Sequence, residues 1–124
     1  MKKYELVLED CINVSGEPLY RIRALVDFAN AASGDLGGYV QSETNLSHDG
    51  ECWIADEAIV QHDSRIEDDA LIYGHAHIFG GATVKDGAKI GGFAQVSRQM
   101  VISGDGIIEA DRPTAGPSPF ELLG

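Results

Sequence analysis

The residues of this 124-residue chain that are best suited to chemistry are two histidines and a group of carboxylates. His75 and His77 stand one residue apart in the stretch Ile72-Tyr-Gly-His-Ala-His77. An imidazole titrates near neutral pH, so either residue can act as a general base or as a metal ligand. What they do depends on the elements that position them.

Acidic residues are concentrated in the middle of the chain. From Glu43 to Asp69 there are nine acids and a single base, Arg65. The formal net charge is −11 and the isoelectric point is near 4.5. Binding to a phosphate backbone depends on Lys and Arg, so this charge excludes direct contact with nucleic acid. We expect a basic protein as partner instead.

Aliphatic residues recur at every sixth position over nearly half of the chain. These ten rungs are Ile54, Val60, Ile66, Ile72, Ile78, Val84, Ile90, Val96, Ile102 and Ile108. Four residues after each of the first seven rungs the side chain is small: Ala58, Ser64, Ala70, Ala76, Ala82, Ala88 and Ala94. A fixed period of six residues is typical of parallel β-helices.

The six-residue period predicts the fold. Neither an α-helix nor a straight strand brings every sixth residue to one face, but a chain that turns a corner every six residues does. Three sides then close a coil of eighteen residues, and coils stack as parallel strands about 4.8 Å apart. We predict an all-β, parallel β-helix with three interior columns: Ile54, Ile72, Ile90 and Ile108; Val60, Ile78 and Val96; and Ile66, Val84 and Ile102.

The same eighteen-residue step stacks carboxylates at one corner. It places Asp49 on Glu67, Glu51 on Asp69, and Asp68 on Asp86. The predicted partner-binding ridge therefore comprises Asp49, Glu51, Glu67, Asp68, Asp69 and Asp86. The alternative is that β-helix corners are simply polar, with Asp and Gly selected for turn geometry.

Three aromatic residues are expected on the outer surface. The register of the rungs turns Tyr73, Phe79 and Phe93 outward. Exposed aromatics on a flat sheet face generally mark an interface, and copies of the same chain are the most common partners. We predict that these three residues form an oligomer interface.

The repeat resembles the left-handed parallel β-helix superfamily, the trimeric acyltransferase-like hexapeptide-repeat proteins, from about Leu36 to Ile108. The resemblance implies a left-handed coil and a homotrimer. The stretch around His75 and His77 is similar to the histidine-bearing coils of hexapeptide acyltransferases, in which an imidazole is general base toward an acceptor hydroxyl or amine. His75 or His77 would take that role, with acyl-CoA as cofactor. However, no inserted loop interrupts the rungs to shape a coenzyme A cleft.

The γ-type carbonic anhydrases share this fold and hold zinc with three histidines between subunits. The spacing of His62, His75 and His77 differs from theirs. We therefore predict no metal and no resident cofactor.

The first half of the chain carries a second resemblance. The segments Tyr20-Arg-Ile-Arg-Ala-Leu25, Gly34-Asp-Leu-Gly-Gly-Tyr39, Asn45-Leu-Ser and Cys52-Trp53 look like those of uncharacterised phage and bacterial β-helix proteins. The resemblance implies a phage or prophage origin and no particular chemistry.

Three segments organise the chain. Residues 1–34 read as strand, turn and strand around Ser15-Gly-Glu-Pro18, a hairpin expected to cap the open first coil. Residues 35–110 form the β-helix. Residues 111–124 contain three prolines and are expected to be a tail.

The first coil is expected to be irregular. The glycines of Asp35-Leu-Gly-Gly-Tyr39 suit a tight entry, and Val40, Leu46 and Cys52 would continue the column of small residues that Ala58 begins.

The cysteines and the apolar segments bear on the compartment. Cys11 and Cys52 have neither CxxC nor zinc spacing, and the chain shows no cationic apolar export segment and no apolar run of membrane length. We expect free thiols and a cytoplasmic protein, in the host cytoplasm if a phage encodes it.

These features together predict a non-enzymatic, homo-oligomeric binding or structural module. Its acidic surface would engage a basic protein, such as a host defence or nucleic-acid-binding complex. An acyltransferase is the alternative.

Overall fold

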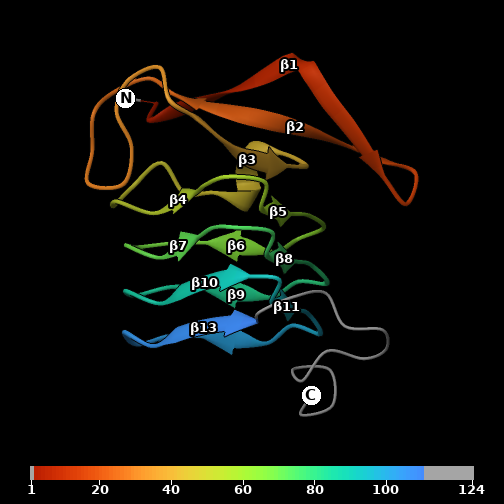
Figure 1. Cartoon of the computed structure of the whole chain (residues 1–124), viewed down its shortest axis with the longest axis vertical. Coiled ribbons are helices and arrows are strands. Elements are labelled where there is room, and N and C mark those ends of the chain that lie inside the picture. Colours follow the sequence, from red (N-terminus) through yellow and green to blue (C-terminus); the bar gives the residue numbers. More distant parts are fainter. Residues whose placement is uncertain (1, 111–124) are drawn as a thin grey trace.

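Each rung is the second residue of a short strand, and the strands stack in three columns that form the sides of a solenoid (Figure 1). The computed structural model describes residues 2–110. Side 1 comprises β4 (Trp53–Ile54), β7 (Leu71–Ile72), β10 (Lys89–Gly92) and β13 (Ile107–Ala110). Side 2 comprises β3 (Leu36–Val40), β5 (Ile59–Val60), β8 (His77–Ile78) and β11 (Gln95–Val96). Side 3 comprises β6 (Arg65–Ile66), β9 (Thr83–Val84) and β12 (Val101–Ile102).

The register between coils is eighteen residues, as predicted. On side 1, Ile54 pairs with Ile72, Ile72 with Ile90, and Ile90 with Ile108, all in parallel. The rungs from Ile54 to Val96 are fully buried, and so are the small residues that follow them. The all-β, parallel β-helix is confirmed, and no α-helix occurs within residues 2–110. The left-handed coil stays a prediction.

A second ladder of six-residue period forms the corners. Two residues after each of the first nine rungs the backbone has a positive φ, at Asp56, His62, Asp68, Gly74, Gly80, Asp86, Gly92, Arg98 and Gly104. Only Gly tolerates this conformation freely, and Asp and His are among the side-chain-bearing residues that adopt it most readily. The side chains of this corner ladder also bridge coils: Asp68 Oδ2 accepts the Asp86 N–H at 3.1 Å, and Asp86 Oδ2 accepts the Gly104 N–H at 2.9 Å.

The first coil is longer than the others, and this corrects one expectation. Val40 pairs with Val60 and Leu46 with Ile66, a step of twenty residues. Both residues therefore head columns of rungs, not the column of small residues. Cys52 does stand above Ala70, because its neighbour Trp53 pairs with Leu71. The two extra residues are accommodated between Leu46 and Cys52, at a corner, where they leave the strands unchanged.

An N-terminal hairpin closes one end of the solenoid. β1 (Tyr4–Val14) and β2 (Glu17–Ala24) pair antiparallel around a two-residue turn, in which Ser15 and Gly16 both have positive φ. β2 then pairs antiparallel with β3 and so covers the edge of the first coil. Entry into that coil requires glycine, because a Cβ on Gly38 would lie 2.3 Å from the carbonyl oxygen of Ala58.

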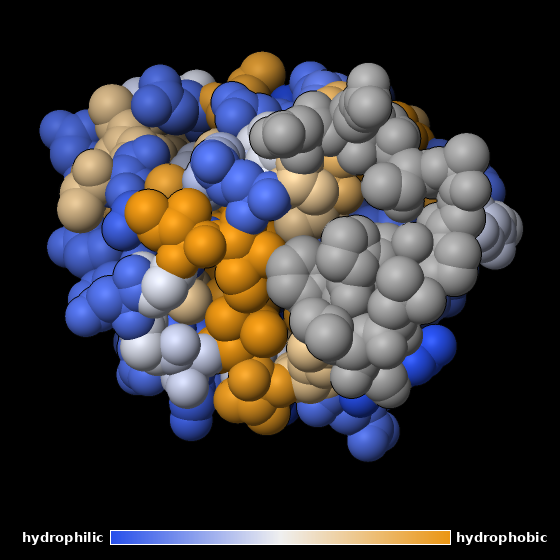
Figure 2. Space-filling view, turned by 60° about the horizontal axis from the view of Figure 1, so that its bottom comes forward, coloured by the Kyte–Doolittle hydropathy of each residue, from blue (hydrophilic) through white to orange (hydrophobic). Residues whose placement is uncertain are grey.

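The opposite end of the solenoid is apolar. The last rungs, Ile102 and Ile108, are only partly buried, and the neighbouring side chains of Val101 and Ile107 are 60% and 64% exposed. Figure 2 turns this end toward the reader and shows apolar residues gathered in a strip. The predicted tail, residues 111–124, lies outside the described residues.

In the described part of the chain, helical structure is limited to the 3₁₀-helix η1 (Glu43–Asn45), in the first coil. Within residues 2–110 no helix has the length and apolar character needed to cross a bilayer.

Substitution of one rung should show how much the interior columns contribute. Ile72→Ala removes a fully buried side chain stacked between Ile54 and Ile90, and we expect it to lower the free energy of unfolding by about 3 kcal/mol. Lys89→Ala, an exposed residue of the same side, should change it by less than about 0.5 kcal/mol. Unfolding by denaturant, followed by circular dichroism, measures both values. Equal losses would contradict the stacked interior.

Candidate functional site

Most of the predicted ridge residues lie at one corner, between sides 3 and 1. Asp68 contacts Asp86 as described above, and the Glu51 N–H donates to Asp69 Oδ1 at 3.1 Å, so two of the three predicted stacks occur. The third does not. Ser47 occupies the place above Glu67. The Ser47 N–H donates to the Ile66 carbonyl, in the same way that the Glu67 N–H donates to the Val84 carbonyl on the next coil.

Asp49 is displaced because it falls in the enlarged corner of the first coil. Its position depends on the two extra residues there, which the eighteen-residue step did not anticipate. Asp49 remains exposed on the surface, next to Gly50, whose backbone approaches that of Asp68.

The corner carboxylates have few cationic neighbours. Among the described residues, Glu67 is the only one of the six that forms an ion pair, and its distance to Arg65 is 3.9 Å. Asp68 and Asp86 each use one carboxylate oxygen to accept a backbone N–H from the next coil. Turn geometry therefore explains why Asp occurs at these two positions. Their second oxygens and their charge remain directed toward solvent.

The histidine of strand β8 is held in the neutral state. His77 Nε2 is hydrogen bonded to the Gln61 side-chain oxygen, so the ring proton lies on Nε2 and the lone pair on Nδ1. Burial, together with the nearby His62, lowers the pKa of His77 to about 4. A base with so low a pKa is a poor proton acceptor for the hydroxyl group of an acceptor substrate at neutral pH. The local chemistry does not favour His77 as general base.

His62 belongs to a polar cluster that joins the hairpin to side 2. Its Nδ1 accepts the Gly80 N–H at 3.1 Å, and its Nε2 lies 2.9 Å from Glu17 Oε1. The same Glu17 oxygen accepts a hydrogen bond from the buried Gln61 at 2.8 Å. Both ring nitrogens of His62 are thus engaged. The sequence gives no sign that Glu17 and Gln61 join His62 in one cluster, because no local pattern connects residues 44 positions apart.

The two predicted interface phenylalanines each contact a histidine. His75 stacks on Phe93 with ring centroids 4.8 Å apart and ring planes inclined by 4°, and His77 packs on Phe79 at 4.4 Å. His75 is exposed. These rings lie on side 2 and at its corner with side 1. The strands β5, β8 and β11 contain no Asp, Glu, Lys or Arg.

Tyr73, the third predicted interface residue, is held against the solenoid. Its hydroxyl is hydrogen bonded to Glu109 Oε2, two coils further along, and this bond raises the pKa of Tyr73 to about 12. The ring lies over Gly91, where a Cβ would come within 2.0 Å of it. Tyr73 therefore fastens three coils together, and it belongs to side 1.

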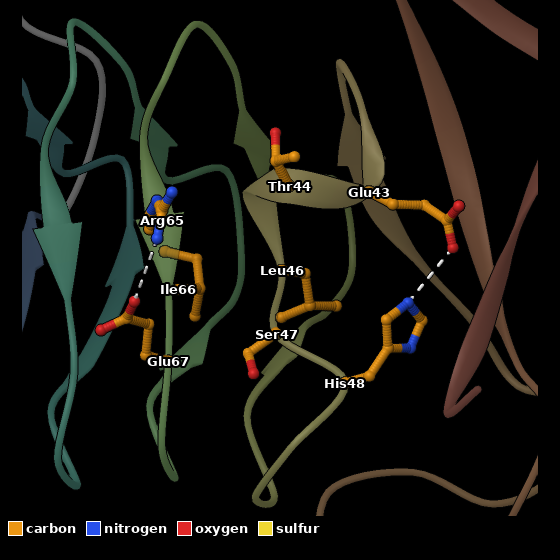
Figure 3. A pocket seen from close by; sticks show the side chains of 8 residues that line it. All are labelled: Glu43, Thr44, Leu46, Ser47, His48, Arg65, Ile66 and Glu67. Atoms are coloured by element: carbon orange, nitrogen blue, oxygen red, sulfur yellow. Dashed lines mark hydrogen bonds and ion pairs between the residues drawn. The ribbon is translucent and has the colours of Figure 1, made fainter. Parts of the chain in front are cut away.

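A pocket of ≈ 250 Å³ opens on side 3, where η1 replaces a strand of the first coil. Figure 3 shows Glu43 and His48 joined on one wall and Arg65 and Glu67 joined on the other. The remaining lining residues are Thr44, Leu46, Ser47 and Ile66. Because its charged side chains already contact one another, the pocket carries no unpaired group that would select a ligand.

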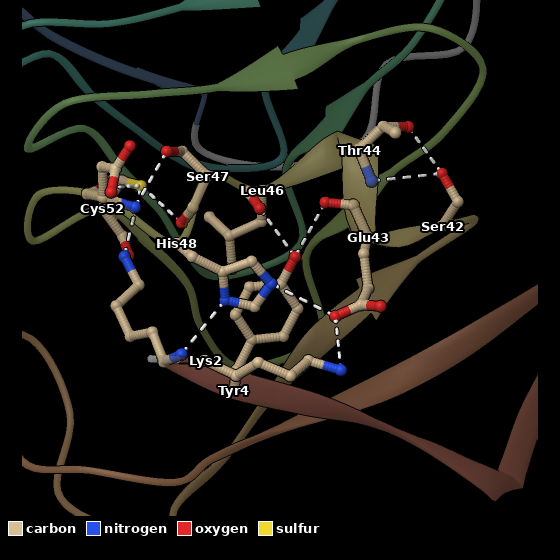
Figure 4. Close-up of polar contacts among 11 residues, drawn as sticks. Lys2, Tyr4, Ser42, Glu43, Thr44, Leu46, Ser47, His48 and Cys52 are labelled. Carbon is tan, nitrogen blue, oxygen red and sulfur yellow. Dashed lines mark hydrogen bonds and ion pairs between the residues drawn. The ribbon is translucent and has the colours of Figure 1, made fainter.

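Beside this pocket, polar groups attach the N-terminal strand to the first coil (Figure 4). The Tyr4 hydroxyl has a single proton, which it shares between the Leu46 carbonyl at 2.6 Å and the Glu43 carbonyl at 2.9 Å. Burial raises the pKa of Tyr4. The hydrogen bond from Lys2 lowers the pKa of Glu43. These side chains are engaged in fastening the hairpin.

The described cysteines are both free, as expected. Cys52 is buried, and its burial raises the pKa of the thiol, which keeps it protonated and unreactive. Lys3 Nζ donates to the Cys52 carbonyl at 2.7 Å, within this buried region. Cys11 is exposed on β1. Within residues 2–110, no three His, Cys, Asp or Glu side chains are grouped to hold a metal ion.

The neutral state of His77 predicts a pH dependence of stability. Its folded pKa of about 4 lies below the ordinary value of 6.5, so the unfolded chain binds more protons between these pH values. Neutral His77 therefore contributes to stability fully above pH 6.5, and this contribution is lost as the pH falls. We expect the free energy of unfolding to decrease by about 2 kcal/mol between pH 7 and pH 5 from this group. His77→Gln should remove this part of the pH dependence, measured by denaturant unfolding at both pH values. Gln95→Ala, on the next coil of side 2, should leave it intact.

No protein-family model matches this chain, and no curated protein matches its sequence. The fold and the chemistry of the surface are therefore the evidence from which a function is inferred.

Proposed function

We propose that this protein is a non-enzymatic, homo-oligomeric β-helix that binds a basic protein through its acidic corner. The observation that carries the proposal is the set of exposed carboxylates between sides 3 and 1, of which Asp49, Asp68, Asp69 and Asp86 have no ion-pair partner among the described residues. We use the name acidic corner for Asp49, Glu51, Glu67, Asp68, Asp69 and Asp86.

The spacing of these carboxylates supports electrostatic recognition. Asp68 and Asp86 lie one above the other, one strand spacing apart, so their like charges repel each other in the free protein. A cationic partner relieves that repulsion and is attracted by the formal net charge of −11. Such complementarity accelerates association and selects basic surfaces over acidic ones.

The class of partner follows from the charge and from the sequence resemblance to phage and prophage β-helix proteins. A host protein that itself binds nucleic acid, including one in a defence complex, carries a basic surface of the kind this corner fits. The site of action would then be the host cytoplasm.

The neutral side supports self-association. Side 2 presents Phe79, Phe93 and neutral His77 on or beside the strands β5, β8 and β11, which contain no residue with a formal charge, in a protein that is otherwise strongly acidic. Three copies that meet along these strands bury no charged strand residue, and the burial of unpaired charge is a major cost of forming an interface. The homotrimer and the left-handed coil implied by the hexapeptide-repeat resemblance fit this arrangement.

Charge removal that preserves the turns tests the acidic corner. The triple variant Asp68→Asn, Asp69→Asn and Asp86→Asn keeps the side-chain oxygens that accept backbone N–H groups and removes three charges. Binding of a fluorescent deca-lysine peptide, measured by anisotropy at low salt, should weaken at least fivefold. Added salt should weaken binding to the wild-type protein in the same way.

A second triple variant separates the corner from net charge. Glu9→Gln, Asp27→Asn and Asp35→Asn remove the same number of charges from the hairpin and the loop that follows it. Its affinity for the deca-lysine peptide should stay within twofold of wild type. Equal weakening by the two triple variants would show that binding follows total charge and would reject the acidic corner.

The mass of a variant protein in solution tests whether side 2 is the oligomer interface. Phe79→Glu introduces a charge into the neutral side, and we expect the mass in solution, measured by light scattering, to fall to one third of the wild-type value. Thr83→Glu, which is equally half-buried but lies on side 3, should leave the mass unchanged. An unchanged mass for folded Phe79→Glu would contradict the trimer.

A further inference from the structure

We draw no further inference here: the strongest candidate, the apolar strand edge that β12 and β13 leave unpaired within residues 2–110 at the C-terminal end of the solenoid, carries nothing because no described residue shows what covers it.

Discussion

The hydrogen bonds between successive coils are the constraint on which the rest of the structure depends. Strand N–H groups donate to carbonyls of the next coil, as from Leu71 to Ala88 and from Lys89 to Gly106. This pattern persists only while each circuit keeps its length, because a shift of one residue would turn interior side chains to the surface. The first circuit is longer, and its extra residues are confined to a corner, where no strand is disturbed.

Much of the fold is visible in the sequence because every coil meets the same environment. Each rung stacks on other rungs, so the same requirement for Ile or Val is repeated, and ten repeats exceed chance. The first coil was harder to place, since its neighbour on one side is the hairpin. The repeat therefore predicts the wrong column for Val40 and Leu46, and it predicts that Asp49 lies on Glu67, a position that Ser47 occupies in the structure.

Contacts that join distant segments could not be predicted from spacing. One example is the series of hydrogen bonds that links Glu17, Gln61 and His77, which depends on how the hairpin lies against side 2. Another is the hydrogen bond between Tyr73 and Glu109, which depends on the Tyr73 ring lying over Gly91. The sequence did suggest that Tyr73 faces outward. It did not reveal that the hydroxyl already has a partner, which separates Tyr73 from Phe79 and Phe93 as an interface residue.

The corner ladder gives this solenoid a natural unit of growth. Because Asp68, Asp86 and Gly104 repeat one conformation at intervals of one circuit, an inserted stretch of eighteen residues would add a coil and leave the hairpin and the last strands with their present neighbours. An insertion of six would preserve the interior equally well, yet it would rotate everything downstream by a third of a circuit. A change in the length of such a chain during evolution therefore also changes its orientation, because each inserted six-residue step moves the downstream residues to another side of the solenoid.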